Sequence, residues 1–388
     1  MAKALTSNVL PFLYVSMFVI SLSIGMFSPL VPLYAQRLGA SYFDLGIIGV
    51  AWSAPYIVLP AIIGALADKF GRRDFLLVGM AGCALVSGLF LLAHEFWHVT
   101  VIRALNGIAY SFLWPVAEAL IVDITSSAER MKAMGRYSFS WALGILIGPL
   151  FGGLLLKTFG FTVLFSTSLV VAISAFIITL YTMLFRHQTK SQPSTPEITS
   201  SSKGIVAVSL HPIYLVIVMY SIATGLIFSI FPAYAEGLGL DAFQIGTLFS
   251  MLGVTRTLTF WYSESITRIG EKRSIMLALV TQALSLIAIA HLYGFIPFLI
   301  LMALLGFSIG ILSPLSLSIA SKMASSAKVA VTMGIVEGIS GIGWTIGPII
   351  GGTAAESLGP TYPYLIFGGI TILSIIPIIL WLKREKST

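Results

Sequence analysis

Long apolar runs alternate with short polar stretches along this chain of 388 residues. A helix of about 20 apolar residues is long enough to cross the hydrocarbon core of a bilayer. In the first half, runs of that length fall at 8–34, 43–66, 75–94, 97–123, 134–157 and 161–186. In the second half they fall at 209–235, 243–264, 274–292, 295–320, 329–355 and 361–382. The pattern predicts an all-α integral membrane protein with twelve transmembrane helices.

The second six segments repeat the first six. The segment GILIGPLFGG is matched by GWTIGPIIGG at an offset of 199 residues. Nearer the start of each copy the offset is 200, where Gly46 matches Gly246. Two tandem copies of one ancestor explain both offsets. We therefore predict two pseudo-symmetric six-helix bundles, at 1–186 and 208–388, joined by a polar cytoplasmic linker at 187–207.

Composition and charge placement agree with a membrane protein. Hydrophobic residues make up 57% of the chain and charged residues 10%, which are too few charges to cover a soluble surface. With the N-terminus inside, 18 Lys and Arg side chains fall on the cytoplasmic side and only Arg37 and Lys157 outside, as the positive-inside rule requires. We predict a multi-pass protein of the cytoplasmic (inner) membrane with both termini in the cytoplasm. The net charge of +7 then suits anionic lipid headgroups and needs no nucleic-acid partner.

The polar stretch after the second apolar segment reads GALADKFGRRD and contains Gly64, Asp68, Gly71 and Arg72. It closely resembles the signature loop of the major facilitator superfamily. The resemblance implies that Asp68, Arg72 and Asp123 form a cytoplasmic charge latch, whose breakage favours the inward-open state. Gly64 and Gly71 would permit a tight turn and close helix approach. A solvated basic loop that only enforces topology is the alternative.

Two further motifs narrow the resemblance. A pattern of glycines and one proline occurs once in each half, as Gly144, Gly148, Pro149, Gly152 and Gly153 and as Gly343, Gly347, Pro348, Gly351 and Gly352. It resembles the motif typical of proton-coupled drug antiporters. The proline bends the helix, and the glycines allow close packing with the partner helix of the other half. The segment RALNGIA, which begins at Arg103, resembles a motif that the superfamily places in the cavity of its first half.

Apart from the helix ends, the interior of the predicted spans holds four charged residues, where charge is costly and usually marks a pathway: Arg103, Glu118, Arg256 and Glu337. Helical spacing puts the first two on one face with Gly107, Tyr110 and Trp114, and puts Glu337 on one face with Trp344. Further aromatic residues are expected to extend the wall of a central cavity: Trp52, Tyr56, Trp141 and Tyr220.

These residues suggest roles in transport. We predict that Glu118 and Glu337 are proton-coupling or cation-binding acids, and hydrogen-bonded structural acids are the alternative. Arg256 has Ile57 at the matching position of the first half, which argues against a symmetric structural role. It would either pair with Glu337 or bind an anionic group of the substrate.

The resemblance implies a monomeric secondary transporter that works by alternating access, not an enzyme. We predict proton-coupled export of small amphipathic or cationic compounds, with protons and a small-molecule substrate as partners in the lipid bilayer. The alternatives are a carrier of an organic anion or another small metabolite that uses Arg103 and Arg256, and a sensor or lipid-moving protein that does not transport. No Walker loop or dinucleotide fingerprint is present in the sequence, so we expect no cofactor, and we expect no metal.

Overall fold

The structure is a computed structural model that describes residues 9–185, 212–262, 268–323 and 329–384. Within these ranges the regular secondary structure is entirely helical. The predicted linker at 187–207 lies outside the described residues, so its boundaries stay a prediction.

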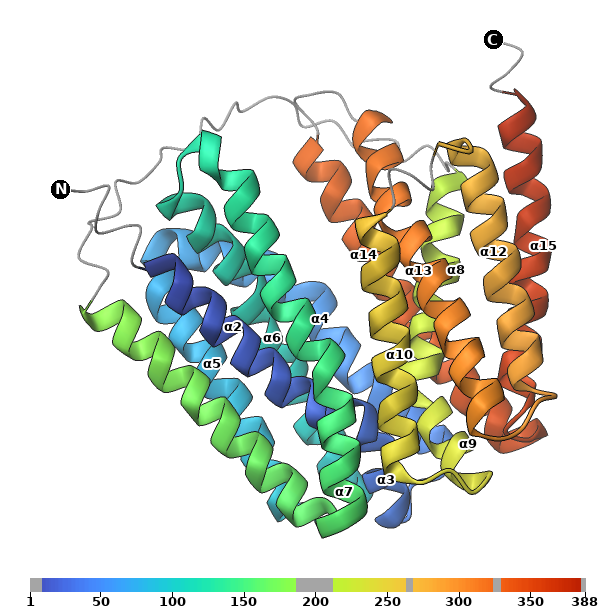
Figure 1. Cartoon of the computed structure of the whole chain (residues 1–388), viewed down its shortest axis with the longest axis horizontal. Coiled ribbons are helices and arrows are strands. Elements are labelled where there is room, and N and C mark those ends of the chain that lie inside the picture. Colours follow the sequence, from blue (N-terminus) through green and yellow to red (C-terminus); the bar gives the residue numbers. More distant parts are fainter. Residues whose placement is uncertain (1–8, 186–211, 263–267, 324–328, 385–388) are drawn as a thin grey trace.

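The first half forms six passes, which Figure 1 shows in blue to green. The first pass is α2 (Val9–Phe27), broken by the 3₁₀ turn η1 (Ser28–Leu30) and continued by α3 (Val31–Arg37). It was predicted as one uninterrupted span, and Pro29 and Pro32 lie at the break. The next passes are α4 (Tyr42–Phe70), α5 (Arg72–Leu89) with η2 (Phe90–Leu92), and α6 (Phe96–Ile124).

The last element of the first half, α7 (Ser127–Phe185), supplies the fifth and sixth passes. Gly160 has a φ of 84° and a ψ of −179°, so the chain reverses direction there although hydrogen bonding continues on both sides. The boundary predicted between the fifth and sixth helices, after residue 157 and before residue 161, therefore coincides with the reversal at Gly160.

The second half repeats this arrangement in yellow to red (Figure 1). It consists of α8 (Pro212–Ser229), α9 (Phe231–Gly237), α10 (Ala242–Trp261), α12 (Glu271–Ile289), α13 (Phe295–Met323), α14 (Val329–Leu358) and α15 (Tyr362–Arg384). The prediction of an all-α protein with two pseudo-symmetric six-helix bundles is confirmed.

The equivalent helices α4 and α10 each begin with a capping box. The Ser41 side chain accepts a hydrogen bond from the Asp44 N–H at 3.2 Å, and the Asp44 carboxylate accepts one from the Ser41 N–H at 2.9 Å. Asp241 and Gln244 form the same reciprocal pair, with both hydrogen bonds at 2.9 Å. Such capping boxes satisfy backbone donors that the first turn leaves unpaired, and they fix where each helix starts.

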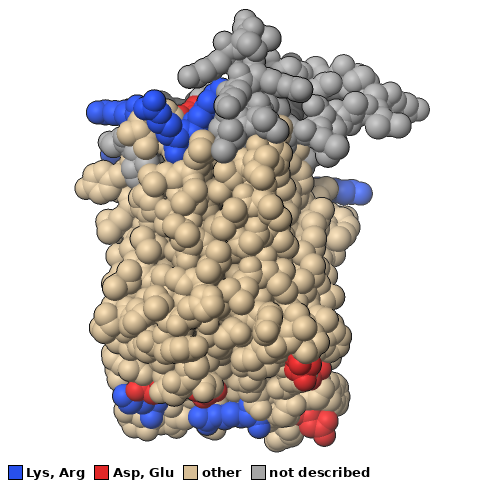
Figure 2. Space-filling model, turned by 90° about the vertical axis from the view of Figure 1, so that its right-hand side faces the viewer, with Lys and Arg blue, Asp and Glu red and all other residues tan. Residues whose placement is uncertain are grey.

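The surface has the polarity expected for a lipid environment. Eight segments of the described residues are long and apolar enough to cross a membrane, and one of them contains both passes of α7. On the face shown in Figure 2, the middle of the molecule is free of charged side chains, which gather at the two ends. We call the end where α2 begins and α15 ends the terminal end, and the other the opposite end (Figure 1).

Candidate functional site

The two halves meet along two pseudo-symmetric helix pairs, α4 with α14 and α7 with α10. Toward the opposite end, Gly46 of α4 packs against the Pro348 carbonyl and Gly352 of α14. Gly246 of α10 packs in the same way against the Pro149 carbonyl of α7. A side chain at either glycine would overlap backbone atoms of the other half, so both pairs need glycine for this close approach.

The remaining glycines of the repeated motif face their own half, which corrects the prediction that they pack against the other half. Gly144, Gly148 and Gly152 pack against α2 of the first half. Gly343, Gly347 and Gly351 pack likewise against α8 of the second half. Because 3.6 residues make one helical turn, adjacent glycines point to different neighbours. Among the glycines and prolines of the motif, Gly153 and Gly352 pack against backbone of the other half, and Pro149 and Pro348 pack against glycines of the other half.

A layer of aromatic rings crosses the boundary next to these glycines. The Trp344 ring of α14 lies 5.8 Å from that of Trp52 and 6.4 Å from that of Tyr56, both on α4. The hydroxyls of Ser53 and Thr345 meet at 3.0 Å in the same layer. This layer is therefore built by both halves, and its aromatic faces are suited to apolar or cationic groups.

The aromatic layer continues into the first half along the predicted face of α6. The Tyr110 ring lies 6.2 Å from Trp52 and 6.1 Å from Trp114, and Trp114 lies 5.8 Å from Trp141 of α7. Gly107 packs directly against the Trp52 carbonyl, which brings α6 close to α4. Tyr220 belongs elsewhere, since it is buried in the second half with its hydroxyl 3.5 Å from that of Ser340.

The structure places Glu118 and Glu337 on the terminal side of this layer, one on each half. Both side chains are exposed. Glu118 lies one helical turn beyond Trp114 on α6, and Glu337 lies two turns before Trp344 on α14, so each acid adjoins a ring of the aromatic layer. Within the described part of the chain, neither has a hydrogen-bond or ion-pair partner. Two unneutralised acids, one from each half, can bind a proton or a cation.

The two interior arginines lie away from these acids. Arg103 contacts the aromatic layer, with its guanidinium 5.5 Å from the Trp52 ring, and donates hydrogen bonds to Asn106 at 3.0 Å and Ser28 at 3.5 Å. Arg256 lies over the Phe260 ring at 5.9 Å. Among the described residues, neither arginine has a carboxylate within 4.0 Å, so the structure does not show the expected pairing of Arg256 with Glu337.

The predicted charge latch is assembled within the first half. The Arg72 guanidinium lies 2.7 Å from Asp68 and 2.7 Å from Asp123, and donates to the Ala119 carbonyl at 2.6 Å. Gly71 has a φ of 112°, which makes the turn between α4 and α5 possible. Gly64 has open space where a side chain would project. The arginine therefore joins the ends of α4, α5 and α6 at the terminal end.

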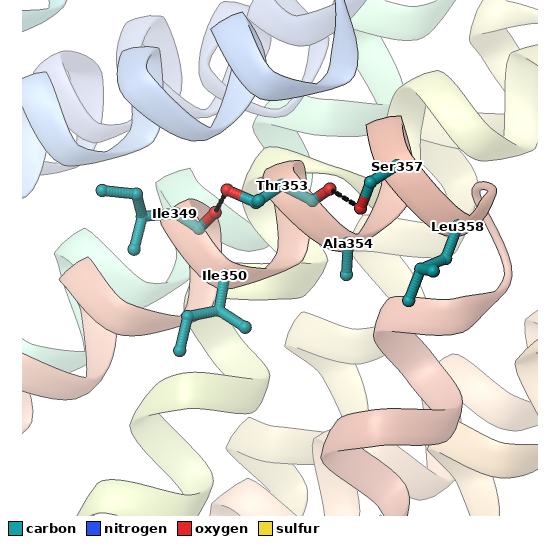
Figure 3. A pocket seen from close by; sticks show the side chains of 6 residues that line it. All are labelled: Ile349, Ile350, Thr353, Ala354, Ser357 and Leu358. Atoms are coloured by element: carbon teal, nitrogen blue, oxygen red, sulfur yellow. Dashed lines mark hydrogen bonds between the residues drawn. The ribbon is translucent and has the colours of Figure 1, made fainter.

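A shallow surface hollow lies elsewhere in the described part of the chain. It has a volume of about 320 Å³ and is lined by Ile349, Ile350, Thr353, Ala354, Ser357 and Leu358, all from α14 (Figure 3). Its two hydroxyls already donate to carbonyls of the same helix. Since it contains none of the predicted site residues and offers no unpaired polar group, it is not the functional site.

Several contacts between the two halves were not predicted from the sequence. At the opposite end, Lys157 of α7 pairs with Asp241 at 2.8 Å, and the Glu356 carboxylate of α14 accepts the Tyr42 N–H at 2.9 Å. Residues this far apart in sequence carry no local signal of their contact. The sequence does carry one indirect signal, because the repeat offset of 199 relates Lys157 to Glu356.

Comparisons with known proteins agree with this geometry. The model of the Major Facilitator Superfamily matches residues 13–295 and, in a second match, 213–388. Multidrug resistance protein 2 of Bacillus subtilis (strain 168) is 26% identical over 388 residues, covering 96% of this chain and 94% of that protein. Multidrug resistance protein MdtG of Escherichia coli O17:K52:H18 is 27% identical, covering 92% and 90%.

Solved structures share the fold at low sequence identity. The crystal structure of the nucleoside transporter NupG has a TM-score of 0.80 at 14% identity and covers 97% of this chain and 99% of that one. The POT family transporter PepTSo has a TM-score of 0.77 at 13% identity, covering 98% and 99%. The resemblance seen in the signature loop is thus confirmed. This chain belongs to the Major Facilitator Superfamily and is a multi-pass membrane transporter, not an enzyme.

Proposed function

We propose that this transporter exports small amphipathic or cationic compounds in exchange for protons, by alternating access of a central site. The observation that carries the proposal is the pair Glu118 and Glu337, one acid from each half, both exposed beside the shared aromatic layer. Aromatic faces attract a lipophilic cation, and an unpaired carboxylate can hold either that cation or a proton. The names of the two multidrug resistance relatives support the same class of substrate.

The direction of transport follows from a proposed orientation. Exposed Lys and Arg side chains of the terminal end include Lys132 and Arg136, whereas among the described residues the exposed ones of the opposite end are Arg37 and Lys157. The positive-inside rule then makes the terminal end cytoplasmic, with both termini inside. In this orientation the acids are accessible from the cytoplasm in the present structure.

A second candidate is transport of an organic anion. Arg103 and Arg256 are two interior guanidiniums without a carboxylate among the described residues, and Nε of Arg103 is buried with no hydrogen-bond partner there. A planar guanidinium binds a substrate carboxylate through paired hydrogen bonds. This candidate predicts that Arg256→Ala abolishes substrate binding.

Proton movement in proteoliposomes separates the two candidates. Vesicles that contain a pH-sensitive dye receive lipophilic cations or organic anions, with the unmodified protein, Glu118→Gln or Glu337→Gln. We expect cations to drive proton flux that both variants abolish, because Gln keeps the shape of Glu and loses the titrating group. Glu129→Gln is the matched control, since Glu129 is an exposed acid whose carboxylate accepts a hydrogen bond from Ser126.

Other outcomes would contradict the proposal. Flux with anions alone would favour the arginine site, and proton flux retained in both Gln variants would remove the two acids from the coupling path. No flux with any compound would favour a sensor or a lipid-moving protein.

A further inference from the structure

The opposite end brings positive charge of the first half against negative charge of the second. Lys157 Nζ lies 2.8 Å from Asp241 Oδ2 and 6.0 Å above the Phe243 ring. Arg37 acts electrostatically on Glu236, where α3 meets α9. Lys157 is therefore paired with an acid of the other half, whereas the Arg37 guanidinium lies 4.8 Å from the ring of Phe161 in its own half.

A third contact joins the halves through a helix terminus. The Glu356 carboxylate at the end of α14 accepts the N–H of Tyr42, the first residue of α4, at 2.9 Å. The first turn of a helix has unpaired N–H groups and a partial positive charge, so a carboxylate there is favourable. This contact also places negative charge of the second half against a positive group of the first.

The contacts of Lys157 and of Glu356 are equivalent under the pseudo-symmetry that relates the two halves. The offset of 199 relates Lys157 to Glu356, and the offset of 200 relates Ser41, the cap of α4, to Asp241, the cap of α10. At each place a side chain near the end of a long helix reaches the first turn of the partner helix. The charge is reversed between the two places, and both versions are attractive.

We propose that Lys157–Asp241 and Glu356–Tyr42 form an electrostatic clasp that holds the opposite end closed and opens once in each transport cycle. The clasp lies beside the glycine contacts of Gly352 with Tyr42 and of Gly153 with Ala242, so it closes the same boundary. The Lys157 and Asp241 side chains are 50% and 39% exposed, and partly exposed ion pairs are weak enough to break reversibly. The clasp does not depend on which compound is transported or on proton coupling.

Distances between spin labels measure the clasp in the full chain reconstituted in lipid. A Cys83→Ser background receives Phe159→Cys and Tyr293→Cys, two exposed positions of opposite halves at the opposite end. Lys157→Gln, Asp241→Asn and Glu356→Gln should each increase the ratio of open to closed distances there by about two- to fivefold. Lys157→Arg should keep the unmodified ratio because it keeps the charge.

The choice of variants separates the clasp from loss of folding. Asn is as good a helix cap as Asp, so Asp241→Asn keeps the oxygen that accepts the Gln244 N–H and removes only the charge. The double variant Lys157→Gln with Asp241→Asn should open the end no further than either single change. Lys132→Gln, at an exposed lysine of the terminal end with no ion pair among the described residues, is the control. Unchanged ratios in all three clasp variants, or additive effects in the double variant, would overturn the proposal.

Discussion

The boundary between the two halves differs sharply from one end to the other. Toward the opposite end, Gly46 and Gly246 touch the backbone of the other half, and ion pairs and a capped helix lie beside them. On the terminal side of the aromatic layer, Gly64 and Gly338 have open space where a side chain would project. The hydrogen bonds and ion pairs that join described residues of the two halves all lie in that layer or nearer the opposite end. The structure is therefore closed at the opposite end and open at the terminal end.

This difference explains why the two acids are accessible together. Glu118 and Glu337 lie just beyond the last packed layer, where Gly341 still contacts Ile57 across the boundary. Closure of the terminal end would bring the helices that carry both acids together and would shield them from water. The state of the boundary, and not a change within either half, then decides from which side the site is reached.

The largest expected effect comes from filling a packed glycine of the opposite end. In Gly246→Leu the new side chain would overlap the Pro149 carbonyl, and overpacking costs about 1–3 kcal/mol, or about 5- to 150-fold in an equilibrium. Spin-label distances at the opposite end should lengthen, and transport should fall. Gly64→Leu is the matched control, because its side chain meets nothing in the present state. Equal distances in Gly246→Leu and the unmodified protein would show that this contact does not hold the end closed.

The aromatic layer lies where the packed and open regions of the boundary meet. Removing one of its rings should have the next largest effect, which is on substrate binding. Trp344→Ala deletes a ring of the second half that contacts both Trp52 and Tyr56. An aromatic or cation contact of this kind is worth about 1 kcal/mol, so the Kd of a lipophilic cation should rise about fivefold. Fluorescence titration measures the Kd. Trp97→Ala, an exposed tryptophan at the start of α6, should leave the Kd unchanged.

The charge latch tests the terminal end itself. All contacts recorded for Arg72 stay within the first half, so Arg72→Ala should loosen α4, α5 and α6 locally and leave the clasp intact. By the family resemblance, the open terminal end should become more populated, by less than about fivefold for partly exposed ion pairs. Labels at Met131→Cys and Ile269→Cys report on this end. Shorter distances would contradict the expected role of the latch.

The smallest effect is that of acidity on the clasp. Burial raises the pKa of the Asp241 carboxyl, but hydrogen bonds from Lys157 and the Gln244 backbone outweigh it and lower the pKa below the usual value. Because the closed state has the lower pKa, its stabilisation by this pair is present above about pH 4 and is lost as the pH falls further. Opposite-end distances should stay constant between about pH 5 and 8 and lengthen only below about pH 4. A change between pH 5 and 8 in Asp241→Asn and the unmodified protein alike would point to another titrating group.

The sequence predicted most of the fold because membrane helices carry a strong local signal. Apolar length and the repeat located all the passes, whereas the bend at Gly160 depends on a positive φ that no hydropathy pattern reports. The shared face of Tyr110, Trp114 and Glu118 followed from helical spacing. That Glu337 lies beside the same aromatic layer as Glu118, while Arg256 does not pair with Glu337, depends on how the two halves dock. Docking is set by contacts between residues far apart in the chain, and their identities were not readable from spacing.

The reversed charges of Lys157 and Glu356 also govern which halves can assemble. Two copies of the first half, docked in this way, would place Lys157 against Ser41, whose N–H and hydroxyl are already bonded to the Asp44 carboxylate. Two copies of the second half would place Glu356 against Asp241, and the like charges would repel. The unlike combination avoids this repulsion and gives attraction at both places. The charges of this boundary thus select against assembly of two second halves, and the covalent tandem supplies each second half with a first half.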